Sequence, residues 1–188
     1  MFDDFFNSLK DAMLAKAKEA VDELGKRLAV PEPAGSFTLV RRFTLDDDTI
    51  TKGGIALIDG CWQIEAYDDD RRDRFLNPTE PLRSVILFEV PEPDVSECVF
   101  ACRFSAKARN SEKPIKVSLG VRRSGQLGTV TRLWGQGVST SAEFSTYEVR
   151  AHFKKESDSA WVQISVQFES SGILQIRDVE LLQARVKA

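Results

Sequence analysis

The chain has 188 residues, of which 42% are hydrophobic, enough for one domain with a packed core and too many for a disordered chain. Its 26 basic and 29 acidic side chains leave a formal net charge of −3, so no global positive field attracts nucleic acid or other polyanions. Twelve phenylalanines, against two tyrosines and three tryptophans, indicate that most aromatic surface fills the core.

The cysteines and the apolar runs point to a soluble cytoplasmic protein. Cys61, Cys98 and Cys102 are odd in number, and in one strand the last two lie about 13 Å apart, too far for a disulfide. A reducing compartment fits this cysteine usage. The first residues lack the basic and continuous apolar parts of a secretory signal, and no apolar run approaches the roughly 20 residues of a membrane span.

Residues 2–29 have apolar side chains at three- and four-residue steps, which is typical of one face of a helix. Two prolines and a glycine in residues 31–36 end this helix and predict a short, stiff linker. We therefore expect an amphipathic helix in residues 1–30, a linker in residues 31–36 and a folded domain in residues 37–188. The apolar first half of the helix carries Phe2, Phe5, Phe6, Leu9 and Met13.

This apolar helical face must be buried against something, because a detached helix does not leave it in water. Three destinations compete: the chain's own folded domain, a second copy or a protein partner, and a membrane surface. Residues 1–30 carry six acidic and five basic side chains, which disfavours attraction to anionic lipid. The pattern does not separate the first two destinations.

After residue 36 the period of the apolar residues changes to two. Residues 115–121 and 162–168 alternate apolar with polar or small side chains, which predicts half-buried strands. About nine strands, separated by turn residues and without a helical pattern between them, favour an antiparallel β-sandwich. The other predicted strands are residues 37–43, 62–67, 85–90, 98–106, 129–134, 147–153 and 174–182. Turns are predicted at residues 53–54, 59–60, 77–78, 91–93, 110–111, 124–125, 135–137 and 170–172.

The strand pattern of residues 144–149 and 161–168, a turn at Gly172 and the closing run 174–181 carry a family resemblance. Residues 82–182 resemble the carbohydrate-binding-module-like, galactose-binding-like jelly rolls, in which the closing strand commonly has one or two aspartates before valine and leucine. The resemblance implies a mainly β fold, an antiparallel jelly-roll β-sandwich, here preceded by the N-terminal amphipathic α-helix. The same sandwich serves sugar binding, protein docking and spacing, so it specifies function weakly.

The chain departs from that family in two ways. Many calcium-bearing relatives have an aspartate where this chain has Arg177, and a guanidinium group does not ligate calcium. Secreted relatives carry a signal peptide, which is not recognised here. We therefore expect no metal and give less weight to a role on extracellular polysaccharide.

The motifs of catalysis and of cofactor binding are missing. The aspartate runs 46–48 and 68–70 alternate between faces in extended chain, so solvated turns are favoured over a calcium or acid–base site. Segment 68–74 mixes four aspartates with three arginines and is interpreted as a solvent-facing loop, with an anion or partner site as the alternative. His152, the only histidine, falls on the polar side of its strand. No nucleophile elbow, phosphate loop or dinucleotide motif occurs, so we predict a non-enzyme without a cofactor.

Sugar recognition uses aromatic rings against pyranose faces and polar side chains for hydroxyl groups. If the apolar residues of run 162–168 face inward, Trp161 shares the outward side with Gln163 and Gln167. Trp134, next to a glycine-rich predicted turn, is expected at a loop rim. The alternative is that two or three of the five candidate rings fill the core or cover an edge. These rings are Trp62, Tyr67, Trp134, Tyr147 and Trp161.

The leading interpretation is a non-catalytic binding module with a saccharide or another polar ligand, held by Trp161, Gln163, Gln167 and Trp134. The alternative is a structural or assembly protein whose N-terminal helix mediates oligomerisation, partner docking or attachment to a membrane surface. A third, weaker hypothesis is a hydrolase that uses the aspartate-rich loops. No nucleic-acid partner is expected.

Overall fold

A computed structural model describes residues 29–67, 81–125 and 128–187 of the chain. Two units divide the chain, Met1–Val30 and Pro31–Ala188, and the second is described below. The predicted helix, apart from residues 29 and 30, lies outside the described residues, together with its interaction residues Phe2, Phe5, Phe6, Leu9 and Met13. Segment 68–74 lies outside them too. The assembly role of the helix therefore stays a prediction.

The described part of Pro31–Ala188 is built from β-strands, and no helix in it is long and apolar enough to cross a membrane. Nine strands correspond to the nine predicted runs, and the tenth, β2, is a four-residue strand too short to show a period. The strands are β1 (Thr38–Arg42), β2 (Ile55–Ile58), β3 (Cys61–Ala66), β4 (Arg83–Pro91), β5 (Glu97–Arg109), β6 (Ile115–Gly125), β7 (Gly128–Val138), β8 (Ser145–Lys154), β9 (Ser159–Phe168) and β10 (Gly172–Ala184).

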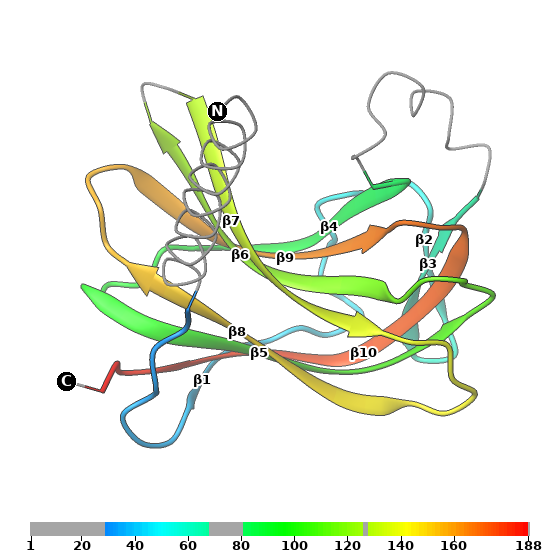
Figure 1. Cartoon of the computed structure of the whole chain (residues 1–188), viewed down its shortest axis with the longest axis horizontal. Helices are drawn as coiled ribbons and strands as arrows, with labels where there is room; N and C mark the ends of the chain where they lie inside the picture. Colours follow the sequence, from blue (N-terminus) through cyan, green and yellow to red (C-terminus); the bar gives the residue numbers. More distant parts are fainter. Residues whose placement is uncertain (1–28, 68–80, 126–127, 188) are drawn as a thin grey trace, which may run out of the picture. The chain divides into compact units, whose positions relative to one another are not determined.

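The strands form two antiparallel sheets, which Figure 1 shows as two layers. One sheet has four strands in the order β4-β9-β6-β7. The other has six: the order is β2-β3-β10-β5-β8, and β1 also pairs with β10. The strand pairs β3/β10 and β5/β8 lie in one sheet and the pairs β4/β9 and β6/β7 in the other. This order is that of a jelly roll, with β1 and β2 added to it.

The core lies between the two sheets. Val162, Ile164, Val166 and Phe168 on β9 are at most 1% exposed, as the alternation in the sequence predicts. Each such side chain stabilises the fold by roughly 1.5 to 3 kcal/mol relative to an exposed position. The largest fully buried side chains come from both sheets: Trp62, Phe100, Phe104, Phe153, Phe168, Ile64, Leu87, Ile115, Leu119, Ile164, Leu174 and Ile176.

Two of the predicted glycine turns have different outcomes. Asp59 and Gly60 join β2 to β3 with φ of 51° and 73°, the positive φ pair of a two-residue hairpin turn. In contrast, Gly135 lies inside β7, so the turn predicted at residues 135–137 is wrong. A Cβ at Gly135 would lie 2.8 Å from the side-chain carbons of Lys116 on β6. This glycine therefore provides room for a neighbouring side chain within a sheet.

Two strands contain irregularities that change which side chains face outward. In β4 the register with β9 shifts between Ile86 and Phe88, so Leu87 and Phe88 are both buried and Glu89 faces outward. In β10 the register with β5 shifts between Arg177 and Glu180, and Asp178 has a φ of 53°. Aspartate tolerates this left-handed conformation better than most residues.

Glu148 on β8 links two strands and the segment before β1. Its carboxylate accepts hydrogen bonds from Nε of Arg103 on β5 and Nε of Arg150, each 2.6 Å long. Both guanidinium groups lie near the ring of Phe37, with Cζ 5.8 Å and 5.3 Å from its centroid. Partial burial opposes ionisation of Glu148, but the two hydrogen bonds outweigh it and lower the pKa of its carboxyl group.

We expect Glu148→Gln to lower the free energy of unfolding at neutral pH by about 1 kcal/mol or less, as for other partly exposed ion pairs. Because the folded-state pKa lies below the ordinary value of 4.5, the stabilisation is full above that pH. It is lost as the pH falls through the folded-state pKa. Urea unfolding from neutral pH down to about pH 3 measures this difference.

The control is Glu143→Gln, since Glu143 is exposed and makes no ion pair with a described residue. It should unfold like the unsubstituted protein at every pH. A stability gap for Glu148→Gln that stays constant down to the acid end would contradict the expected role of the two arginines.

Candidate functional site

The four-stranded sheet has one face turned away from the core. Residues directly opposite each other on neighbouring strands share a face, so the register fixes which side chains lie together on it. We call this surface the Trp161 face. It is formed by Ser84, Ile86, Glu89 and Pro91 on β4, Trp161, Gln163, Ser165 and Gln167 on β9, Lys116, Ser118, Gly120 and Arg122 on β6, and Thr131, Leu133, Gly135 and Gly137 on β7.

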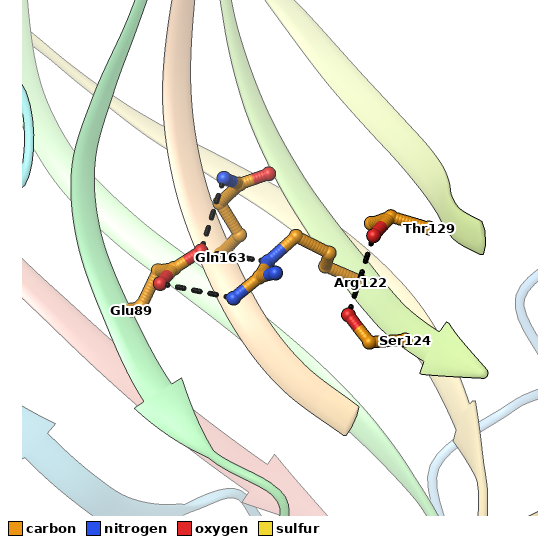
Figure 2. Close-up of polar contacts among 5 residues, drawn as sticks. All are labelled: Glu89, Arg122, Ser124, Thr129 and Gln163. Carbon is orange, nitrogen blue, oxygen red and sulfur yellow. Dashed lines mark hydrogen bonds and ion pairs between the residues drawn. The ribbon is translucent and has the colours of Figure 1, made fainter. Parts of the chain in front are cut away.

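A hydrogen-bonded cluster crosses three strands at the centre of the Trp161 face (Figure 2). Arg122 on β6 donates from Nε and Nη2 to the two carboxylate oxygens of Glu89 on β4, at 2.9 Å and 3.3 Å. Gln163, on the strand between them, donates from Nε2 to Oε1 of Glu89 at 3.3 Å. The two charged side chains are 27% and 18% exposed. The cluster is therefore held in place and is still reachable from solvent.

Trp161 adjoins this cluster. It lies directly opposite Arg122 in the ladder between β6 and β9, and the guanidinium carbon is 4.6 Å from the centroid of its ring. Such a contact contributes about 0.5 to 1 kcal/mol where it is exposed. The ring is partly exposed, so an apolar surface lies next to the polar cluster on one face.

Two serines lie farther along the same face. Ser118 and Ser165 are cross-strand neighbours, 0% and 4% exposed. Neither hydroxyl group has a hydrogen-bond partner among the described residues. A buried hydroxyl without a partner costs about 1 to 3 kcal/mol. Both hydroxyl groups are shielded from solvent, so this part of the face is buried beneath neighbouring side chains.

Gln167 occupies the other end of the row on β9. It lies opposite Lys116 on β6 and Ser84 on β4, about 13 Å along the strand from Gln163, and is partly exposed. At the opposite end, the hydroxyl oxygens of Ser124 and Thr129 lie 3.3 Å apart, as Figure 2 shows. Hydroxyl and amide groups thus follow the whole length of the face.

The structure does not bring Trp134 to this site. Trp134 lies opposite Leu119, whose side chain is completely buried, so it points to the core side of the sheet and packs against the core. The expected loop rim is wrong as well, because the flanking glycines belong to β7. Of the predicted ligand residues, Trp161, Gln163 and Gln167 share one face and Trp134 does not.

The other candidate aromatic rings divide between core and surface. Trp62 is 2% exposed and packs edge-on against Phe88, with centroids 5.2 Å apart. Tyr147 stacks on Phe104 at 5.5 Å. Tyr67 is 57% exposed. The alternative, that two or three of the five rings fill the core or cover an edge, is therefore confirmed. Of the three tryptophans, Trp161 lies on the Trp161 face.

The thiols of the described residues are buried, and no metal-binding cluster is found among these residues. Cys61, Cys98 and Cys102 are free and buried, and burial raises the pKa of Cys98 and Cys102 to about 12. Both thiols stay protonated near neutral pH and act as small apolar side chains. No group of three or more histidine, cysteine or acidic side chains in this part of the chain is arranged to hold a metal ion.

Sequence analysis did not single out Glu89 or Arg122. Arg122 continues the alternating polar positions of run 115–121, so the sequence could have placed it on the outer face of its strand. For Glu89 the sequence predicts the wrong side, because strict alternation from Val85 and Leu87 puts it in the core. The irregularity at Leu87 moves it to the outer face, and only the strand pairing places it beside Gln163.

No protein-family profile and no curated protein matches the chain. Its structure is similar to the CBM22-1 xylan-binding domain from Paenibacillus barcinonensis, with 9% identity, a TM-score of 0.44, and 82% of this chain and 99% of that one covered. It is similar to a family 61 carbohydrate-binding module in complex with β-1,4-galactotriose, with 18% identity, a TM-score of 0.34 and coverage of 64% and 68%. It is also similar to a structure of infectious bursal disease virus, Gt strain, with 9% identity, a TM-score of 0.44 and coverage of 84% and 38%.

Carbohydrate-binding modules, which the sequence resembles, are thus among the solved structures to which the fold is similar. The TM-scores are all below 0.5 and no identity exceeds 18%, so the likeness is one of strand arrangement.

We expect Glu89 and Arg122 to be energetically coupled. Glu89→Gln and Arg122→Gln should each lower the free energy of unfolding by about 1 to 2 kcal/mol, and the double variant by less than the sum. Urea unfolding of the four proteins measures the coupling. Asp94→Asn with Lys155→Gln is the matched control, because that pair is exposed and its atoms are 3.7 Å apart. Equal coupling in the two pairs would contradict a rigid cluster on the Trp161 face.

Proposed function

We propose that the protein is a non-catalytic module that binds a neutral saccharide on the Trp161 face. The observation that carries the proposal is the partly exposed Trp161 ring beside the Arg122, Glu89 and Gln163 cluster on one sheet face. An aromatic ring packs against the apolar side of a sugar, and fixed polar groups bind its hydroxyls.

The charges of this face favour a neutral ligand. Glu89 and Arg122 neutralise each other through two hydrogen bonds, so the centre of the face has polar groups without net charge. The guanidinium has five N–H donors, two of which bind Glu89, and the others are available to oxygen acceptors. Gln163 adds an amide oxygen that can accept a hydrogen bond from a hydroxyl group. A sugar offers both donors and acceptors to this cluster.

The extent of the face favours a chain of sugars over a single one. Trp161 and Gln167 lie six residues apart on one strand, about 20 Å in extended chain. Both of these side chains are partly exposed, so the two ends of the row can contact separate sugars of one chain.

The test is calorimetric titration with xylan and β-1,4-galactotriose, which are named as ligands of two of the similar structures. We expect Trp161→Ala to weaken binding by about tenfold or more, since the ring contributes both buried area and stacking. Thermal unfolding of the same variant should remain cooperative, because the ring lies outside the core.

Trp134→Phe is the matched control. It retains an aromatic side chain on the core side of β7 and should bind as the unsubstituted protein does. The proposal would be wrong if neither probe binds, if Trp161→Ala binds with unchanged affinity, or if Trp134→Phe is the variant that loses binding.

A further inference from the structure

The outer face of the six-stranded sheet differs in charge from the Trp161 face. Figure 1 shows β8, β5 and β10 side by side in this sheet. The register puts Arg109, Lys107 and Ser105 of β5 on this face at every second position. We call the surface the Lys107 face. It is formed by Ser105, Lys107 and Arg109 on β5, Ile173, Gln175 and Arg177 on β10, Gln63 and Glu65 on β3, and Phe144.

Three cations line this face. Lys107 and Arg109 are two residues apart on β5, and Arg177 on β10 lies opposite Ser105, so each of three successive rows carries one cation. The rows are about 7 Å apart along the strand. Lys107 and Arg109 make no ion pair with any described residue, and the pair of Arg177 with its neighbour Asp178 is long, at 3.4 Å. Two of the three cations therefore have no carboxylate partner in the described part of the chain.

The three cations also act together at one point inside the sheet. Burial raises the pKa of the Cys61 thiol, the nearby Asp59 raises it further, and the charges of Lys107, Arg177 and Arg109 all oppose this rise. The three cations therefore all contribute positive potential near Cys61, the first residue of β3. Among the described acidic residues, Glu65 lies in the same row as Arg109. Asp59, Asp178 and Glu180 lie beside the face, and Glu180 is held by Arg42 at 2.6 Å.

Polar amides lie beside the cations. Gln175, 5% exposed, lies opposite both Lys107 on β5 and Gln63 on β3, and donates from Nε2 to Oε1 of Gln63 at 2.9 Å. Gln63 in turn donates to Glu65 at 2.6 Å. The row from β3 to β5 therefore presents amide groups next to an ammonium group, donors that suit hydroxyl and carboxylate oxygens.

We propose that the Lys107 face is a second binding surface, whose ligand is a linear anionic polysaccharide that carries carboxylates on successive sugars. Guanidinium and ammonium groups bind carboxylates through charge-assisted hydrogen bonds. The three cations lie in successive rows of the sheet, so they can pair with carboxylates that repeat along a polymer. The amide groups of the middle row can form hydrogen bonds with its hydroxyl groups. The net charge of −3 is a sum over the whole chain and does not exclude a local concentration of cations.

The aromatic rings of this sheet argue against a single-stranded nucleic acid as the ligand. Bases bind to such surfaces by stacking on open aromatic rings. The ring of Phe144 already makes cation–π contacts with Lys107, 4.7 Å from its centroid, and with Arg177, at 4.2 Å. Phe37, farther along the sheet, also makes two such contacts. With two cations at each ring, Phe144 and Phe37 offer less open ring surface to a base than Trp161, whose ring has one cation beside it.

The test compares polygalacturonate, xylan and a single-stranded DNA oligomer by calorimetric titration of the full chain at several salt concentrations. Binding of polygalacturonate should weaken as salt screens the charges. Lys107→Gln with Arg109→Gln should bind it about tenfold more weakly, since each exposed ion pair contributes a factor of about two to five. Lys107→Arg should retain binding, because the charge is kept.

The matched control is Lys155→Gln with Lys187→Gln, which removes two exposed lysines beyond the C-terminal ends of β8 and β10, away from Lys107 and Arg109, and should leave the affinity unchanged. The inference is overturned if polygalacturonate does not bind at low salt, if the Lys107 and Arg109 double variant binds as well as the control, or if DNA binds more tightly than polygalacturonate at equal charge.

This inference does not rest on the proposed function. Binding of both polysaccharides by Trp161→Ala tests the two proposals separately. Loss of xylan binding alone supports two independent surfaces. Loss of both polysaccharides in Trp161→Ala shows one shared site and overturns the second surface. Binding of polygalacturonate by a protein that never binds a neutral saccharide overturns the proposed function and supports the Lys107 face.

Discussion

Burial of one side of every strand between the two sheets is the constraint on which the rest of this structure depends. Side chains of a strand alternate in direction, so a strand that gives Val162, Ile164 and Val166 to the core must turn Trp161 and Gln163 outward. A shift of register by one residue would reverse both sets. Core packing therefore fixes the outer surface without any contribution from the outer residues.

The two outer surfaces obtained in this way have different chemistry. On the Trp161 face, Glu89 holds Arg122 through two hydrogen bonds, and the charges cancel. On the Lys107 face, Lys107 and Arg109 find no carboxylate among the described residues, and their positive field remains. Neutral and anionic ligands are therefore suited to opposite sides of one sandwich.

Irregular positions in the strands refine this division. The register shift in β4 buries both Leu87 and Phe88, which brings Glu89 to the face where Arg122 and Gln163 can reach it. In β10 the shift between Arg177 and Glu180 buries Val179 and brings Glu180 opposite Arg103 on the outer face. Each shift changes the side to which a charged residue points without changing the pairing of the strands.

The sequence by itself determined where most strands lie, because period-two alternation is a local property: the predicted runs 115–121 and 162–168 lie within β6 and β9. It also placed Trp161, Gln163 and Gln167 on one side of β9. Only the tertiary structure decided which strands are neighbours, and hence that Glu89 and Arg122 join Gln163 while Trp134 faces the core. Strand pairing and register shifts depend on contacts between residues far apart in the chain, and no local period records them.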